Sequence, residues 1–258
     1  MKSIKKTVEE LRPIDDTFMQ KLAEDKAFCE EMLQVVMEKP SLRVITNIPQ
    51  RNLHNIDTRS VTVDVLCEDE DGSQFSVEVQ RADDDNHQKR VRYNSACVHV
   101  RMLEKGTKFQ DLPDVYMIYI TEKDFLKKGK AIYHVHRIIR ETNEIIENGY
   151  HEIYVNAEID DGTTLAEYMK ILKSTNIEND ERFPHICNAV KYFKVGKGKS
   201  DVCRVVDEYA EEKSREMAKE IAKALICDGV SDLIIHNATK LPMETIANLR
   251  RECERDKT

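Results

Sequence analysis

Residues 59–80 read RSVTVDVLCEDEDGSQFSVEVQ, and this stretch decides the fold of the chain. Apolar and polar residues alternate over 59–67 and again over 74–80, which is the period of a β-strand with one buried face. Between the two runs, Gly72 can take the positive φ that a tight turn requires. The stretch therefore predicts a β-hairpin whose Val and Phe side chains lie on one face and whose polar side chains lie on the other.

The polar face of this hairpin carries two acidic residues on neighbouring strands. With a three-residue loop, Glu70-Asp71-Gly72, forming a type I turn and a G1 bulge, Asp64 lies directly opposite Glu78. Their Cβ atoms would then be roughly 4.5–5.5 Å apart, a spacing at which two carboxylates can share one hard cation. Carboxylates on a hairpin are usually just solvated, so the choice depends on what covers this face.

The near-continuous apolar run at 113–121 predicts a buried central strand, covered by helices on both faces of its sheet. Carboxylates inside such a layered fold are costly unless a cation is paired with them. We therefore interpret Asp64 and Glu78, with Gln80 on the same face, as a metal site.

The remaining elements give the order helix, strand, strand, strand, helix, strand. A helix begins at Asp15 or Asp16 as its N-cap, is split near 24–26 and stops before Pro40; Glu30 and Glu31 are expected to be solvated on it. The other predicted elements are a short strand at 43–49, a polar loop at 50–58, a basic helix at 84–104, a second hairpin from 132–139 and 150–155, helices near 165–172 and 186–193, a linker at 196–200 and a helical tail at 201–255.

Composition limits the functional classes. The formal net charge of −8 argues against a general nucleic-acid binder, so a nuclease needs a local basic patch. The seven cysteines include no CxxC pair, and the charged N-terminus is not a secretory signal, which predicts reduced thiols in the cytoplasm. No apolar run approaches the roughly 18 residues of a membrane span, so no membrane partner is expected.

The hairpin, the motif Glu78-Val79-Gln80 and the αβββαβ order together resemble the PD-(D/E)XK nuclease superfamily. Within it, the chain is similar to the PD-(D/E)XK nuclease family transposases, which are related to recombination-promoting nucleases. LRPIDDTFMQKLAED near the N-terminus, DDDNHQKRVRYNSA after the hairpin and LPDVYMIYIT also carry this resemblance, which covers roughly residues 10–195. It implies an α/β, restriction-endonuclease-like core with a mixed sheet flanked by helices, plus a helical C-terminal tail.

We accordingly expect a nuclease-like domain at 1–195, with its core at about 14–121 and an extension at 122–195, and a helical C-terminal region at 201–258. The resemblance implies that Asp64, Glu78 and the Val79 carbonyl bind Mg²⁺ or Mn²⁺, and that these residues with Gln80 form the catalytic site. The superfamily usually has lysine where this chain has Gln80; an amide can orient a water but cannot supply charge or take a proton. Asp16 is a further candidate metal ligand, although an N-cap role is an alternative for one of the two aspartates.

A basic helix beside the metal site is where contacts to DNA phosphates are expected. The candidate residues are Arg59, Arg81, Lys89, Arg90, Arg92 and Arg101. The alternative is a solvated helix face. His87 could shuttle a proton, or it could be an exposed loop residue. His134 and His136 are expected at the surface. The amphipathic tail lacks a basic recognition face, which favours packing or a homodimer through the C-terminal helices over DNA reading.

The resulting hypothesis is a Mg²⁺-dependent DNA endonuclease that hydrolyses phosphodiester bonds in transposition or recombination. Two alternatives stay open: a catalytically weak or inactive DNA-binding relative, and a nuclease-type defence or toxin protein. The retention of both Asp64 and Glu78 favours the first hypothesis over an inactive relative.

Overall fold

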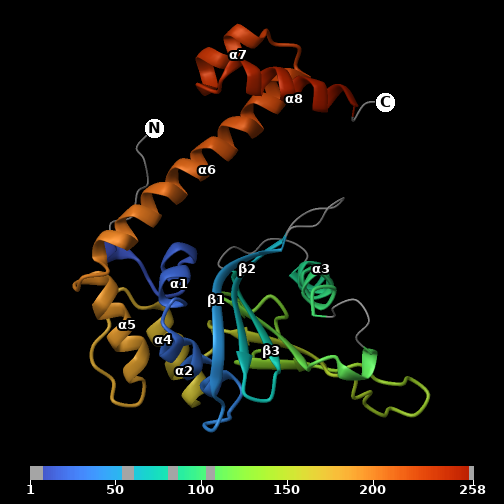
Figure 1. The fold of residues 1–258 in the computed structure, drawn as a ribbon, viewed down its shortest axis with the longest axis vertical. Helices are drawn as coiled ribbons and strands as arrows, with labels where there is room; N and C mark the ends of the chain where they lie inside the picture. Colours follow the sequence, from blue (N-terminus) through green and yellow to red (C-terminus); the bar gives the residue numbers. More distant parts are fainter. Residues whose placement is uncertain (1–7, 54–60, 81–86, 103–107, 256–258) are drawn as a thin grey trace. The chain divides into compact units, whose positions relative to one another are not determined.

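A computed structural model describes residues 8–53, 61–80, 87–102 and 108–255, and its contacts divide the chain into two compact units (Figure 1). The larger unit is Lys6–Val202 and the smaller one contains the C-terminal residues from Cys203. Helix α6, Lys199–Cys227, begins inside the segment 196–200 that the sequence analysis expects to be a linker. The boundaries of the predicted domains, 1–195 and 201–258, stay a prediction.

The larger unit is built on one mixed six-stranded sheet. Its strands are β1 (Val44–Leu53), β2 (Val61–Asp69), β3 (Gln74–Gln80), β4 (Val115–Thr121), β5 (Ile132–Val135) and β6 (Tyr150–Asn156). Their order in the sheet is β1-β2-β3-β4-β6-β5. The β3–β4 and β4–β6 pairs are parallel, and the other three pairs are antiparallel. The predicted αβββαβ order, the central position of β4 and the second hairpin are confirmed.

The first strand is longer than predicted. β1 continues to Leu53 and stays paired with β2, so residues 50–53 of the predicted polar loop belong to the sheet, and residues 54–58 of it lie outside the described part. As a strand at the edge of the sheet, β1 needs backbone pairing on one side only, and polar side chains do not prevent this.

The β2–β3 hairpin has the predicted register. Val65 pairs with Val77, and Cys67 pairs with Phe75. Gly72 has a φ of 81°, and its N–H donates to the Asp69 carbonyl at 3.1 Å. The Asp69 carboxylate also accepts hydrogen bonds from two backbone N–H groups of the loop. A local turn therefore fixes which residues of the two strands face each other.

Helices cover both faces of the sheet. α1 (Asp16–Leu22), α2 (Lys26–Val36), α4 (Thr164–Lys173) and α5 (Pro184–Lys194) lie on one side of the strands, and α3 (His87–His99) lies on the other (Figure 1). On the side of α3, the buried Val91 and Val98 belong to the same apolar cluster as Met117 and Tyr119 of β4. The polar residues on the α3 side of the hairpin are therefore covered by a helix, as the sequence predicts.

The junctions of the helices on the other face are fixed by two acidic side chains. Asp25 separates α1 from α2 and caps α2 by accepting a hydrogen bond from Ala27 N at 2.9 Å. Glu31 accepts hydrogen bonds of 2.9 Å from both His185 N and Ile186 N at the start of α5. The expectation that Glu31 is solvated was wrong, because its partner is a helix end supplied by a distant part of the sequence.

The C-terminal unit contains the remainder of α6, α7 (Asp232–Thr239) and α8 (Met243–Arg255). Its core is formed by Ala222, Ile226, Ile235, Leu241, Ile246 and Leu249. Arg250 of α8 binds Asp232 at 2.5 Å and the Val230 carbonyl at 2.8 Å, which ties α8 to the start of α7. Among the described residues, no helix is both long and apolar enough to cross a membrane.

Candidate active site

Asp64 of β2 lies where the described pairing of the hairpin ends. The ladder between β2 and β3 runs as far as Val65 and Val77, and beyond it Val79 N donates to Asp64 Oδ2 at 2.8 Å. This bond joins the acid of one strand to the backbone of the motif on the other strand. It fixes one carboxylate oxygen of Asp64 and leaves Oδ1 for another ligand.

Glu78 of β3 is enclosed between the sheet and α3, with 4% of its surface exposed. Asn94 Nδ2 of α3 donates a hydrogen bond to Glu78 Oε1, and Arg90 Nε lies 3.8 Å from Glu78 Oε2. Arg90 and Asn94 are four residues apart and therefore on one face of the helix. The basic helix thus contributes an amide and a guanidinium to the carboxylate site.

The electrostatics of the two acids show a deficit of positive charge. Burial and, to a smaller extent, the neighbouring Asp64 raise the pKa of Glu78 to about 7, against the opposing effects of Arg90 and the Asn94 hydrogen bond. Burial likewise raises the pKa of Asp64 to about 6, although the Val79 N–H bond and Arg90 act in the other direction. The ionised forms of both acids are thus disfavoured, and a divalent cation bound between them would stabilise those forms.

Gln80, the residue at the lysine position of the superfamily, is bound to the same arginine. Arg90 Nη1 donates to Gln80 Oε1 at 3.0 Å, and Glu122 N donates to the Gln80 carbonyl at 3.2 Å. One guanidinium therefore contacts both Glu78 and Gln80. The positive charge that glutamine cannot provide is present at the site on another element.

The two N-terminal aspartates take different positions. Asp15 is the N-cap residue of α1, but its buried carboxylate does not cap the helix and instead binds Arg12, which in turn binds Glu122. Asp16 is close enough for its charge to raise the pKa of Asp64. Within the described ranges, no group of three or more His, Cys, Asp or Glu side chains has metal-binding spacing, so Asp16 as a ligand stays a prediction.

The predicted DNA-contacting residues are only partly brought together. Arg59 and Arg81 lie outside the described residues. Lys89, Arg92 and Arg101 are exposed on or just after α3, whereas the Arg90 guanidinium reaches the carboxylate of Glu78. Of the predicted cations that the structure describes, Arg90 alone is shown in contact with the acidic site.

His87 is not an exposed loop residue, whereas its role as a proton shuttle stays a prediction. It is the first residue of α3, 7% exposed, and its Nδ1 lies 2.9 Å from the hydroxyl of Tyr119. Tyr119 is the register partner of Glu78 on β4. Sequence reasoning missed Tyr119 as a site neighbour, because a tyrosine within an apolar strand gives no signal of its own. His134 and His136 are exposed, as predicted.

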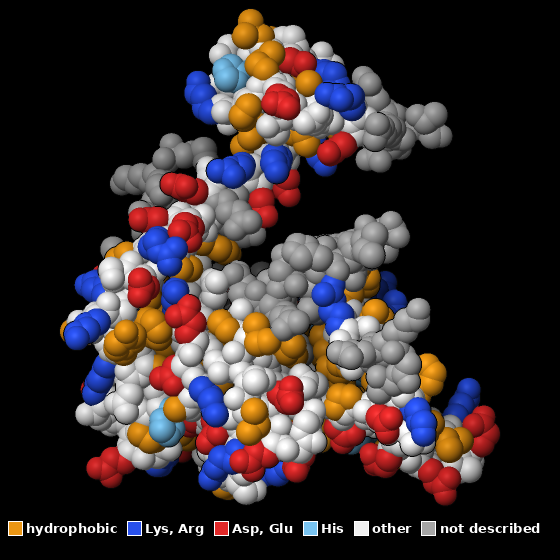
Figure 2. Space-filling view, in the orientation of Figure 1, with side chains coloured by type: hydrophobic (Ala, Val, Ile, Leu, Met, Phe, Trp, Pro, Cys, Tyr) orange, Lys and Arg blue, Asp and Glu red, His pale blue; other side chains and the backbone are white. Residues whose placement is uncertain are grey.

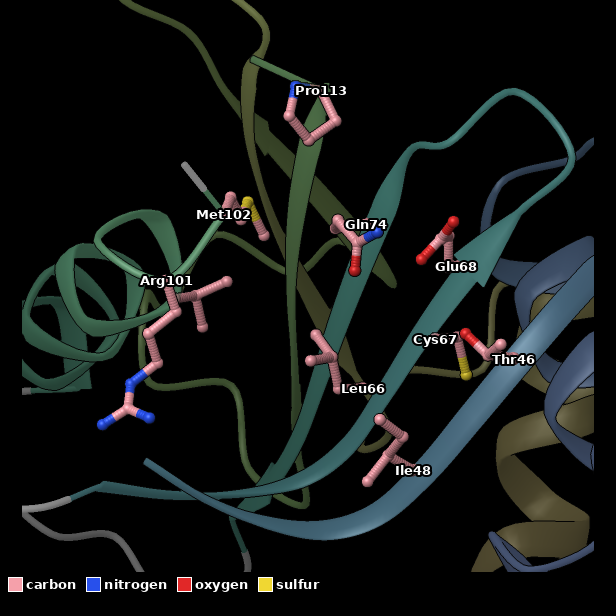
Figure 3. Close-up of a pocket in the computed structure, with 10 residues that line it drawn as sticks. Thr46, Ile48, Leu66, Cys67, Glu68, Gln74, Arg101, Met102 and Pro113 are labelled. Carbon is pink, nitrogen blue, oxygen red and sulfur yellow. The ribbon is translucent and has the colours of Figure 1, made fainter. Parts of the chain in front are cut away.

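A cavity of about 260 Å³ continues along the same face of the hairpin (Figure 3). Leu66 and Glu68 follow Asp64 on β2, and Val98 and Arg101 follow Asn94 along α3. In Figure 3, Met102 and Gln74 lie on opposite sides of the space between the end of α3 and the strands. The elements that position the carboxylates therefore also form a hollow beside them.

Comparison with known proteins agrees with this geometry. A family model described as PD-(D/E)XK nuclease family transposase matches residues 22–194, which is more than half of the chain. No curated protein and no solved structure matches. The matched residues include both acids and all six strands, on a mixed sheet with helices on each face. The chain therefore belongs to the PD-(D/E)XK nuclease family transposases and has their restriction-endonuclease-like fold.

Proposed function

We propose that this chain is a metal-dependent DNA endonuclease that hydrolyses phosphodiester bonds in transposition or recombination. The observation that carries the proposal is the pair of the half-buried Asp64 and the buried Glu78, whose pKa values are raised to about 6 and about 7. Membership of a nuclease family implies DNA as the substrate. The cysteines among the described residues form no disulfide, which is compatible with action in the cytoplasm.

The residues present fit a divalent cation. Carboxylate and carbonyl oxygens are the ligands that Mg²⁺ and Mn²⁺ prefer, and Asp64, Glu78 and the Val79 carbonyl would hold the ion, with Asp16 as a candidate fourth residue. When bound, the ion polarises the scissile phosphate and lowers the pKa of a bound water. Its charge would also offset the cost of ionising the two buried acids.

The chain's own residues then have distinct roles. Val79 N–H holds Asp64 in one orientation, and Asn94 does the same for Glu78. Arg90, beside both Glu78 and Gln80, supplies fixed positive charge where a transferring phosphate gains negative charge. Gln80 can orient a water through its amide group. We therefore assign to Arg90 the charge that the lysine supplies in other members of the superfamily.

An inactive DNA-binding relative is the main alternative, because glutamine replaces that lysine. The contacts of Arg90 favour an active enzyme, since the site does not lack a cation. Genomic neighbours separate the other possibilities: inverted repeats beside the gene support a mobile element, and an adjacent antitoxin gene supports a toxin. A strand-transfer assay with a 3′-hydroxyl donor end separates transposition from simple cleavage.

The test is cleavage of supercoiled plasmid by the full chain with Mg²⁺, Mn²⁺ or EDTA. The variants Asp64→Asn and Glu78→Gln keep the size of the side chains, and Glu70→Gln, in the exposed turn of the same hairpin, is the matched control. We expect nicking by the wild type and by the control with metal only, and its loss in both site variants. Cleavage that survives in either variant, or in EDTA, would contradict the proposal.

A further inference from the structure

An ordered hairpin arm, residues 135–147, continues from the edge of the sheet. β5 is the last strand in the sheet order, and the chain runs directly from it into the arm (the yellow-green loop in Figure 1). Ile138 forms a bridge with Ile145, Ile139 N donates to the Glu144 carbonyl at 2.9 Å, and Ile146 N donates to the Arg137 carbonyl at 2.9 Å. The arm is thus a β-hairpin with its own hydrogen bonds.

The arm exposes an unusual amount of aliphatic surface. Its five large aliphatic side chains are between 39 and 56% exposed: Val135, Ile138, Ile139, Ile145 and Ile146. Since Ile138 pairs with Ile145, these two side chains share one face of the hairpin, and Ile139 and Ile146 lie on the other face. Single exposed aliphatic residues are normal on a protein surface, whereas several on one small hairpin, here with charged residues between them (Figure 2), mark a surface that binds a partner.

The charges of the arm are separated by strand. The outgoing strand carries Arg137, the turn begins with Arg140 and Glu141, and the return strand carries Glu144 and Glu147. All five side chains are exposed. If two arms pack face to face about a two-fold axis that runs along them, the basic strand of each lies over the acidic strand of the other. The surface is therefore complementary to itself, as a symmetric dimer contact requires.

We propose that the arm, residues 135–147, is a self-association surface, and that its partner is the arm of a second copy of this chain. Burial of the aliphatic side chains would drive association, and the separated charges would select the alignment. The three glutamates disfavour a DNA backbone as the occupant, because they would face phosphates. This dimer contact differs from the one expected through the C-terminal helices, and it does not depend on nuclease activity.

The first test is the mass of the full chain in solution over a concentration series to about 100 µM, by light scattering after gel filtration and by sedimentation. We expect the wild type to dimerise and Ile138→Glu with Ile145→Glu to remain monomeric. Val195→Glu is the matched control, because Val195 is 85% exposed but lies outside the arm. A monomeric wild type over the whole range, or a dimer that the double variant leaves unchanged, would overturn the proposal.

The second test uses charge reversal. Arg137→Glu with Arg140→Glu makes the arm acidic, and Glu144→Arg with Glu147→Arg makes it predominantly basic. We expect each variant alone to lose at least tenfold in self-association and a mixture of the two to form a heterodimer. Because Arg137 also lies over the ring of Tyr150, thermal unfolding of each variant checks that the fold persists. Self-association of each variant at the wild-type level, or a mixture that stays monomeric, would contradict the proposed alignment.

Discussion

Arg90 of α3 donates a hydrogen bond of 3.0 Å to Gln80 Oε1 and lies 3.8 Å from Glu78, so one guanidinium contacts two residues of the Glu78-Val79-Gln80 motif. In most members of the superfamily a lysine of the motif itself provides this charge. Here the charge comes from the helix that covers the site. The proposed catalytic site is therefore shared between the hairpin and α3.

This arrangement predicts how the cleavage rate changes when Arg90 is removed and when a lysine is then introduced in place of Gln80. Arg90→Ala should lower the single-turnover rate of plasmid cleavage about 10²-fold, the usual effect of removing one preorganised group that stabilises transition-state charge. Adding Gln80→Lys to that variant should restore part of the rate, because it returns a cation to the motif. Gln88→Ala, on the same helix and exposed, is the control. If the double variant cleaves no faster than Arg90→Ala, the role of Arg90 is not to supply positive charge.

The raised pKa values predict how stability depends on pH in the absence of metal. The folded-state pKa of Glu78, about 7, lies above its ordinary value of 4.5, and that of Asp64, about 6, lies above 3.8. The folded state therefore binds more protons than the unfolded state between about pH 4 and 7, and stability falls as the pH rises through this range. In EDTA, the free energy of unfolding in urea should be larger at pH 5 than at pH 8.

At pH 8, Glu78→Gln should be more stable than the wild type by about 2 kcal/mol, because it removes a buried charge and keeps a group that can accept from Asn94. At pH 5 the difference should nearly vanish. Glu70→Gln, in the exposed turn, should change stability at neither pH. If Glu78→Gln destabilises the protein equally at both pH values, the carboxylate is not the source of the pH dependence.

Metal binding should reverse this pH dependence. Mg²⁺ or Mn²⁺ should raise the melting temperature of the wild type at pH 7.5 and leave that of Asp64→Asn with Glu78→Gln unchanged, because a ligand that binds only the folded state stabilises it. Binding at pH 6.5 should also release protons, since both carboxylates must ionise to hold the ion. Calorimetry in buffers of different ionisation enthalpy measures this release. Binding without any proton release would place the ion elsewhere.

The sequence was sufficient to predict those features of the fold that are determined by residues close together in the chain. Gly72 and the loop before it set the predicted register of the hairpin, which places Asp64 and Glu78 directly beyond the last described pair, Val65 and Val77. Asp25 separated α1 from α2 because a cap acts on its own next turn. The sequence also predicted β4 as a central strand, because a strand covered on both faces is apolar almost throughout.

The sequence was insufficient to predict the position of a side chain whose binding partner is distant in the sequence. Glu31 is buried because it binds backbone groups 154 and 155 residues away, and an isolated helical pattern does not contain this information. The contact of Asn94 with Glu78 likewise depends on how α3 packs against the sheet. β1 extended beyond the predicted strand because an edge strand accepts polar residues.

The contact of Glu31 leads to a prediction about folding stability. Glu31→Ala should destabilise the metal-free protein by about 2 kcal/mol, because the N–H groups of His185 and Ile186 would lose their acceptor at a buried helix end. Glu178→Ala, at an exposed position before α5, is the control and should have little effect. Chemical denaturation at pH 7 measures both. An effect of Glu31→Ala no larger than that of the control would show that solvent can replace the carboxylate.

The hydrogen bond from Asn94 to Glu78 predicts a shift in the pH profile of activity. This bond favours the ionised form of Glu78 and so lowers its pKa. Asn94→Ala should therefore raise the pKa of Glu78, and kcat/KM at a fixed metal concentration below saturation should fall off at a higher pH than in the wild type. The rate on the alkaline plateau should change much less, because Glu78 is ionised there in both proteins. A merely structural role for Asn94 would lower the rate equally at every pH, and a profile of unchanged midpoint would rule out the proposed effect on Glu78.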